Sequence, residues 1–173
     1  MAHIRIAKQE DAPFIALLGR VTFTEAFGHL FEDVRDLHTY LSTTFSVQKI
    51  EASLIKPNNI FWIAFMEKLP IGYAKLKLHS PSDFIQSERI SQLQKIYVLK
   101  DFQSMKIGKK LQDLMLVKAT EIGSEYIWLS VFQGNKRAIA FYEKNNFKFV
   151  GNHEFRIGKK VFDFVAMSKK RYE

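Results

Sequence analysis

The chain alternates between short segments with a two-residue hydrophobic period and longer segments with helical periodicity. Residues 3–7 (HIRIA) alternate like a half-buried strand, and the acidic residues and Pro13 that follow favour a helix from about Asp11. Apolar side chains recur at helical spacing over residues 33–45 and again over residues 46–55. This part of the sequence therefore predicts one strand followed by three helices.

From Ile60 the chain becomes rich in aromatic and β-branched residues, which indicates that strands follow. Residues 59–65 (NIFWIAF) and 71–78 predict two strands, and the turn residues at 67–70 between them predict a hairpin. The polar stretch 79–88 contains a proline and is typical of a loop, whereas residues 91–99 alternate as a third strand.

The last part of the sequence alternates helices with strands. A helical stripe runs from Ile107 to Ile122, and Gly123 is suited to a left-handed C-cap. The other predicted elements are a buried strand over 126–132, a helix over 135–145, and a hairpin of strands 147–156 and 161–168 around a turn at 157–160. Together these elements predict an α/β (α+β) fold with some parallel pairing in the middle of a mostly antiparallel sheet flanked by helices.

Composition limits the classes of protein that fit. The chain has 173 residues, 47% of them hydrophobic, and no linker or repeat, which favours a single domain over residues 1–173. The absence of cysteine excludes disulfides, thiolate metal sites and a cysteine nucleophile. We find neither a signal-like N-terminus nor a membrane-length apolar run, so we expect a cytoplasmic protein without a membrane partner.

The net charge of +8 attracts anions to the surface, and nucleic acid, acidic membrane and phosphate ligands all qualify. The lysines are spread in short clusters, which favours ordinary solvated faces over a nucleic-acid platform. The histidines lack paired metal spacing, so we expect structural or surface roles and no metal for the set His3, His29, His38, His79 and His153.

The segment Gln103-Ser104-Met105-Lys106-Ile107-Gly108-Lys109 is the strongest candidate for a ligand site. It follows a predicted strand and opens an amphipathic helix, where free backbone N–H groups and the helix dipole favour an anion. Gly108 would let a phosphate approach the backbone closely. The pattern lacks GxGxxG and GxxxxGK[ST], which disfavours dinucleotide and P-loop binding. An ordinary turn between a strand and a helix fits the residues equally well.

Three segments carry a family resemblance: 93–98 (LQKIYV), 103–111 (QSMKIGKKL) and 135–151 (NKRAIAFYEKNNFKFVG). Their order and spacing resemble the GCN5-related N-acetyltransferases (GNAT) over about residues 60–169. The cofactor turn of that family is Gln/Arg-x-x-Gly-x-Gly/Ala. Gln103 and Gly108 match it, but Lys106 stands where the first glycine usually lies. Lys106 is then either left-handed under some strain, or the loop follows a different path.

The resemblance implies acetyl-CoA as co-substrate. It assigns the pantetheine arm to backbone groups of Ile96, Tyr97 and Val98, the pyrophosphate to Gln103 to Lys109, and a cofactor contact to Asn135, which also suits a helix N-cap. It further implies that Tyr142 protonates the leaving CoA thiolate, although a tyrosine at this position on an amphipathic helix also suits packing alone.

The base that accepts the amine proton is not evident. Gln94 stands where many relatives carry a glutamate, and a neutral amide cannot take that proton. Glu25, Asp36 and Glu88 are candidates, each of which also fits an ordinary surface acid. Because cysteine is absent, we expect direct transfer rather than an acyl-enzyme.

The aromatic N-terminal stretch, together with residues 72–76 (GYAKL) and 94–98 (QKIYV), resembles the Pai-type spermidine/spermine acetyltransferases. The resemblance implies an acceptor site that includes Phe27, Phe31, Glu25 and Tyr40, although such aromatic runs more often form core. A polycation would need acidic residues at the mouth of the site, and the candidates are Glu25, Glu32, Asp33 and Asp36.

The leading hypothesis is an acetyl-CoA-dependent N-acetyltransferase, monomeric or homodimeric, that acts directly on a primary amine of a small molecule, with a polyamine as one option. The first alternative is a catalytically silent acetyl-CoA sensor or regulatory module. The second, a nucleic-acid binder, rests on charge alone and is disfavoured.

Overall fold

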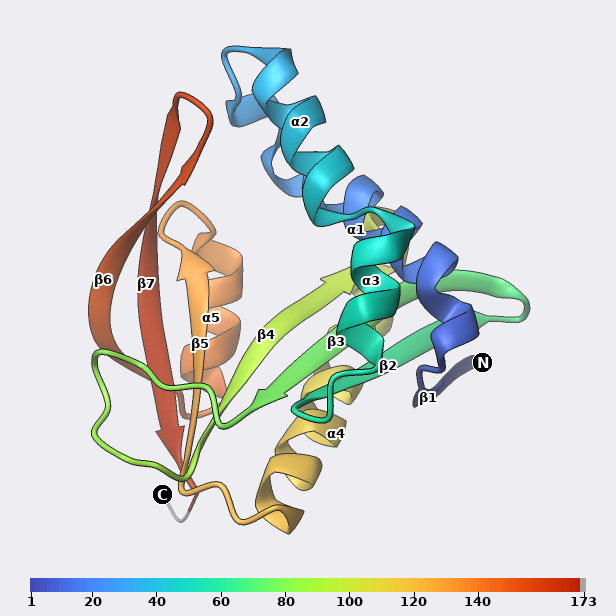
Figure 1. Ribbon diagram of the computed structural model, residues 1–173. Coiled ribbons are helices and arrows are strands. Elements are labelled where there is room, and N and C mark those ends of the chain that lie inside the picture. Colours follow the sequence, from blue (N-terminus) through green and yellow to red (C-terminus); the bar gives the residue numbers. More distant parts are fainter. Residues whose placement is uncertain (172–173) are drawn as a thin grey trace.

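A computed structural model describes residues 1–171 (Figure 1). Its strands are β1 (Ala2–Ile6), β2 (Asn59–Met66), β3 (Leu69–Leu78), β4 (Ile90–Val98), β5 (Tyr126–Phe132), β6 (Lys148–Ile157) and β7 (Lys160–Lys170). Its α-helices are α1 (Ala12–Phe27), α2 (Val34–Thr44), α3 (Val47–Leu54), α4 (Ile107–Glu121) and α5 (Lys136–Lys144). Short 3₁₀ helices are η1 (Gln9–Asp11), η2 (Gly28–Leu30) and η3 (Lys100–Met105).

The strands form one sheet in the order β1-β2-β3-β4-β5-β7-β6. Every neighbouring pair is antiparallel except β4 and β5, which are parallel. These two strands pair only from Ile90↔Tyr126 to Gln92↔Trp128. Beyond that point they diverge, as Figure 1 shows. The sheet thus consists of two antiparallel parts that are joined along a short parallel contact.

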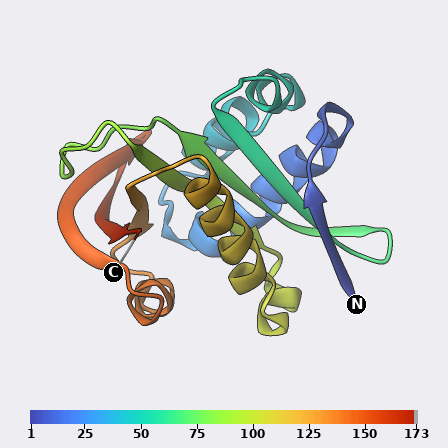
Figure 2. The ribbon, with the colours of Figure 1, turned by 90° about the horizontal axis from the view of Figure 1, so that it is seen from below.

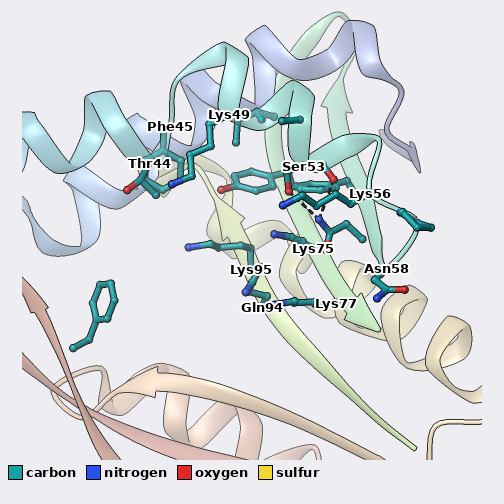
Figure 3. A pocket seen from close by; sticks show the side chains of 17 residues that line it. Thr44, Phe45, Lys49, Ser53, Lys56, Asn58, Lys75, Lys77, Gln94 and Lys95 are labelled. Carbon is teal, nitrogen blue, oxygen red and sulfur yellow. Dashed lines mark hydrogen bonds between the residues drawn. The ribbon is translucent and has the colours of Figure 1, made fainter. Parts of the chain in front are cut away.

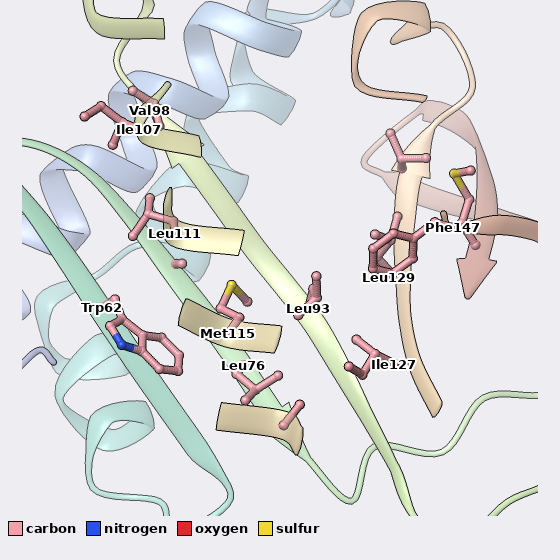
Figure 4. Packing of buried hydrophobic residues seen from close by; sticks show 14 of the residues in the cluster. Trp62, Leu76, Leu93, Val98, Ile107, Leu111, Met115, Ile127, Leu129 and Phe147 are labelled. Carbon is pink, nitrogen blue, oxygen red and sulfur yellow. The ribbon is translucent and has the colours of Figure 1, made fainter. Parts of the chain in front are cut away.

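The helices cover both faces of the sheet. α4 and α5 pack on one face through a core cluster that includes Trp62, Leu93 and Met115 (Figure 4). α1 and α3 pack on the opposite face against Phe61 and Ile63 of β2. Neighbouring residues of β2 thus enter different cores because strand side chains alternate between faces. Figure 2 shows α3 and α4 on opposite sides of the sheet.

Local signals in the sequence explain where several helices begin and end. The side chains of Asp33, Ser46 and Asn135 each accept a backbone N–H of the following helix, as N-caps do. Gly123 has a left-handed φ of 87° just after α4, as predicted. The predicted mixed, mostly antiparallel α/β fold is confirmed. The β2–β3 turn is tighter than the predicted 67–70, because Leu69 and Pro70 belong to β3.

A β-bulge in β4 determines which side chains face which helices. Lys75 of β3 pairs with Lys95, but the next residue, Leu76, pairs with Leu93, so that Gln94 is an extra residue in β4. A bulge of this kind redirects side chains. Leu93 and Ile96 consequently pack on the α4 face, while Gln94 and Lys95 both line cavities on the other.

No helix within residues 1–171 is long and apolar enough to cross a membrane.

Candidate active site

The predicted turn has a defined structure at the end of β4. η3 leads into Lys106, whose φ of 59° and ψ of 22° are left-handed, and α4 begins at Ile107. Of the two sequence-based options for Lys106, the left-handed one is therefore observed. Gln103 reaches back and donates from Nε2 to the Val98 carbonyl at 3.3 Å, which anchors the turn to the strand. As in any α-helix, the first backbone N–H groups of α4 have no carbonyl partner within the helix, so they are available to an anion.

A cavity of about 420 Å³ opens beside this turn, and we call it the α4 cavity. It is formed by the end of β4, the start of α4 and one side of α5. Nine predicted site residues line it: Ile96, Val98, Gln103, Ser104, Lys106, Gly108, Lys109, Asn135 and Tyr142. Arg137, Ala138 and Phe141 also line it and were not predicted, because they signal only an amphipathic helix. Tyr97, Met105 and Ile107 do not line the cavity with their side chains.

The shape of the α4 cavity suits a phosphate-bearing cofactor with an extended arm. A Cβ added to Gly108 would meet nothing closer than Ile96 at 4.0 Å, so the backbone there faces open space. Lys106 lines the same cavity as Gly108. Lys109 lines it too, but its ammonium group is already paired with Asp113. Beyond Gln92, the edge of β4 that faces β5 pairs with no other strand among residues 1–171. That edge can hydrogen-bond the amides of an extended arm.

Tyr142 points into the α4 cavity from α5. Its ring is held between Phe141 and Phe147, with centroids 5.3 and 5.7 Å away. Its hydroxyl has no hydrogen-bond partner among residues 1–171. Burial, and to a smaller extent the side chain of Tyr97, raises the pKa of Tyr142 far above its ordinary value near 10. The hydroxyl is therefore protonated at neutral pH and is able to donate.

Asn135 lines the cavity and caps α5, since its Oδ1 accepts the N–H of Ala138 at 3.1 Å. The two roles proposed for this residue are thus compatible in one conformation.

A second cavity of about 220 Å³ lies on the opposite face of β4, and we call it the aromatic cavity. It is enclosed by α1, α2, β4 and the β6–β7 hairpin. The predicted acceptor residues Phe27 and Tyr40 line it, together with Phe23, Phe155, Phe162 and Phe164. The half-buried Tyr97 also faces it, and desolvation of its hydroxyl raises the pKa of Tyr97 to about 12. Predominantly apolar walls with few polar groups are typical of small-molecule sites.

The aromatic cavity contains a pair of polar groups that sequence reasoning missed. Ser130 of β5 and His153 of β6 are hydrogen-bonded, with Oγ and Nε2 2.7 Å apart. The imidazole of His153 also stacks on Phe164. The two residues are far apart in the sequence, and their side chains meet over β7, which lies between β5 and β6 in the sheet. The alternation of β6 was the only available signal, and it does not distinguish this histidine from a surface one.

Other predicted acceptor residues lie elsewhere. Glu25 lines a depression beside Asn135, where its carboxylate accepts the N–H of Lys100. Phe31, Glu32, Asp33 and Asp36 line a separate depression near the β6–β7 turn, where Asp33 pairs with Arg35. The structure therefore does not bring the four acidic candidates together at the mouth of the aromatic cavity.

Within residues 1–171 there is no cluster of His, Asp or Glu that could hold a metal ion.

Comparison with known proteins identifies the class. The model of the acetyltransferase (GNAT) family matches residues 24–147, which is most of the chain. The protein therefore belongs to the GNAT family and is an N-acetyltransferase, for which acetyl-CoA is the acetyl donor.

Particular relatives support this. An uncharacterized N-acetyltransferase of Lactobacillus delbrueckii subsp. lactis is 26% identical over 154 residues, covering 87% of this chain and 86% of that protein. One from Mycobacterium tuberculosis is 28% identical over 120 residues, covering 69% and 72%. The fold resembles the PaiA N-acetyltransferase of Thermoplasma acidophilum, solved with coenzyme A, at a TM-score of 0.78 and 21% identity over 98% and 99% of the two chains.

Proposed function

We propose that this protein transfers an acetyl group from acetyl-CoA directly to a primary amine of a small molecule. The observation that carries the proposal is the position of the α4 and aromatic cavities, on opposite faces of β4 where it no longer pairs with β5. A thioester in that opening would face an amine held in the aromatic cavity, and such positioning supplies much of the rate of a two-substrate reaction.

Tyr142 is the proposed acid. As the amine nitrogen bonds to the acetyl carbon and the carbon–sulfur bond breaks, the departing CoA thiolate takes a proton. The Tyr142 hydroxyl is protonated, free of other partners and aimed into the α4 cavity, which are the requirements for this role.

His153 is the proposed base, in place of the three acids considered from sequence. With a proton on Nδ1, its Nε2 accepts the hydroxyl proton of Ser130, and the Ser130 oxygen can then take the proton of the amine. The relay leaves His153 protonated, and solvent removes that proton after transfer. Asp36 instead accepts the N–H of Lys159, and Glu25 lies outside the aromatic cavity.

A polyamine acceptor is the more specific option. The resemblance of residues 72–76 and 94–98 to the Pai-type spermidine/spermine acetyltransferases favours it. Against it, neither aspartate nor glutamate lines the aromatic cavity, whereas Lys95 does. A polycation would meet no compensating charge there.

The test measures free thiol released from acetyl-CoA with a panel of amines, alongside acetyl-CoA binding by calorimetry. If the protein binds acetyl-CoA but no amine of the panel causes thiol release, the sensor alternative is favoured. We expect Tyr142→Phe and His153→Gln each to lower kcat about a hundredfold or more, with acetyl-CoA affinity unchanged within about twofold. His38→Gln on the exposed face of α2 is the matched control. Wild-type turnover in either variant would refute that residue's role.

A further inference from the structure

A third cavity, of about 670 Å³, lies beneath α3 and beside the aromatic cavity. Five lysines line it: Lys49, Lys56, Lys75, Lys77 and Lys95. They come from α3, the segment after it, β3 and β4, and Figure 3 shows them around a common space. Neither aspartate nor glutamate is among the lining residues. We call this space the lysine cavity.

The lysine cavity differs from a solvated basic surface because its inner ammonium groups lack counter-ions. Within residues 1–171, none of the five has a carboxylate within ion-pair distance. Lys75 and Lys95 instead lie over aromatic rings: Lys75 Nζ is 5.4 Å from the ring centre of Phe61, and Lys95 Nζ is 5.6 Å from those of Phe45 and Tyr97. Ring faces attract cations but do not neutralise them.

Burial lowers the pKa of both inner lysines, and for Lys75 the charges of neighbouring lysines add to the effect. Burial, followed by the charges of Lys95 and Lys77, lowers the pKa of Lys75 to about 8. Burial also lowers the pKa of Lys95. The fold thus holds several positive charges together at a cost, and a bound anion would relieve that cost.

The lysine cavity is continuous in its lining with the aromatic cavity. Gln94, Lys95 and Phe155 line both. The bulge in β4 turns Gln94 and Lys95 toward this same side. A small molecule can therefore place one end among the lysines and its other end near Ser130 and His153.

We propose that the acceptor is an amine that also carries an anionic group, a carboxylate or a phosphate, and that Lys75 and Lys95 bind this group in the lysine cavity. The inference rests on the proposed function, because it assigns the substrate class of the same site. It places the amine at the Ser130–His153 end of the aromatic cavity, while Lys95, which lines both cavities, binds the anionic group. Two cationic ends, as in a polyamine, do not fit this arrangement.

The first experiment compares acceptors that share an amine and differ in the charge of the other end. Thiol release is measured with 4-aminobutyrate, 4-aminobutanol and 1,4-diaminobutane, and separately with O-phosphoethanolamine against ethanolamine. We expect kcat/KM for an anionic amine to exceed that of its neutral analogue at least tenfold, with the diamine poorest. The two sets of amines distinguish a preference for carboxylate from one for phosphate. Equal or better turnover of the neutral or dicationic amines would overturn the inference and leave the proposed acetyltransfer intact.

Variants locate the effect. Lys75→Met and Lys95→Met should each raise KM for the preferred anionic amine at least tenfold, change its kcat much less, and lower its preference over the neutral analogue. Lys75→Arg should retain most of the preference. Lys68→Met, on the exposed β2–β3 turn, is the matched control. Retention of the full preference in both methionine variants would refute the assignment to this cavity.

A binding measurement decides the case in which no amine is turned over, which would contradict the proposed function. Calorimetric titration of the wild-type protein with 4-aminobutyrate and inorganic phosphate should show binding of at least one. That binding should weaken at least tenfold in the Lys75→Met/Lys95→Met double variant. Absence of binding by the wild-type protein, or equal binding by a folded double variant, would overturn the inference independently of catalysis.

Discussion

The side chain of Gln112 is a polar group in the core whose replacement we expect to stabilise the protein. It lies on α4 and is completely buried, and neither Oε1 nor Nε2 has a hydrogen-bond partner among the described residues. A buried amide without partners costs about 1–3 kcal/mol. Methionine has nearly the same length, a similar helix propensity and no polar group to satisfy. Gln112→Met should therefore raise the free energy of unfolding by about 1–2 kcal/mol.

The assay is urea unfolding followed by far-UV circular dichroism, with thermal melting in parallel. We expect a higher urea midpoint with an unchanged m value, and a Tm about 3–6 °C higher for a chain of this size. The absence of cysteine removes disulfide exchange as a complication. Gln48→Met, at an exposed position of α3, is the control and should change stability by less than about 0.5 kcal/mol. If Gln112→Met instead lowers the free energy of unfolding by about 1 kcal/mol or more, which is the typical contribution of one hydrogen bond, the Gln112 amide has a hydrogen-bond partner and the prediction is wrong.

Two further predictions concern the N-terminal ion pair and the cofactor turn. Asp11 is 2% exposed and accepts from Arg5 at 2.7 and 2.9 Å, so Asp11→Asn should lower the free energy of unfolding by about 2 kcal/mol at pH 7. The hydrogen bond from Arg5 lowers the pKa of Asp11 below 3.8. The stabilisation therefore holds above about pH 4 and is lost as the pH falls through the lowered pKa. Between pH 7 and pH 3, the free energy of unfolding should fall less in Asp11→Asn than in the wild-type protein. Gly108→Val should fold normally, because its Cβ meets only Ile96 at 4.0 Å, but should weaken acetyl-CoA binding at least tenfold by calorimetry. Unchanged binding would mean that the cofactor does not approach Gly108.

The elements of the fold were predictable where their signals are local. Ser46 and Asn135 cap helices through residues three positions further on, and Gly123 ends α4 by its own backbone conformation. The turn between β4 and α4 was predictable for the same reason, since Gln103 and Gly108 lie five residues apart in one segment. Local signals of this kind depend on few assumptions about the rest of the chain.

The linings of the aromatic and lysine cavities could not be predicted because they depend on contacts between distant segments. Gln94 and Lys95 follow a regular alternation in the sequence, and only the pairing of β3 with β4 reveals the bulge that places both on one side. Lys75 has the pattern of a solvent-facing strand residue, yet α3 covers it. Ser130 and His153 come within hydrogen-bond distance only because the sheet places β5 and β6 on either side of β7, an order that the sequence does not reveal.

The brief pairing of β4 with β5 gives the sheet two edges in its interior. An outer edge can recruit a strand of another molecule, which is why exposed edges promote aggregation. The inner edges differ, because β3 already pairs with the far side of β4 and β7 with the far side of β5. A guest can enter only as a single extended chain of amides lying between them. The geometry that we propose for holding a cofactor arm would therefore also protect the protein from pairing with its own copies at this place.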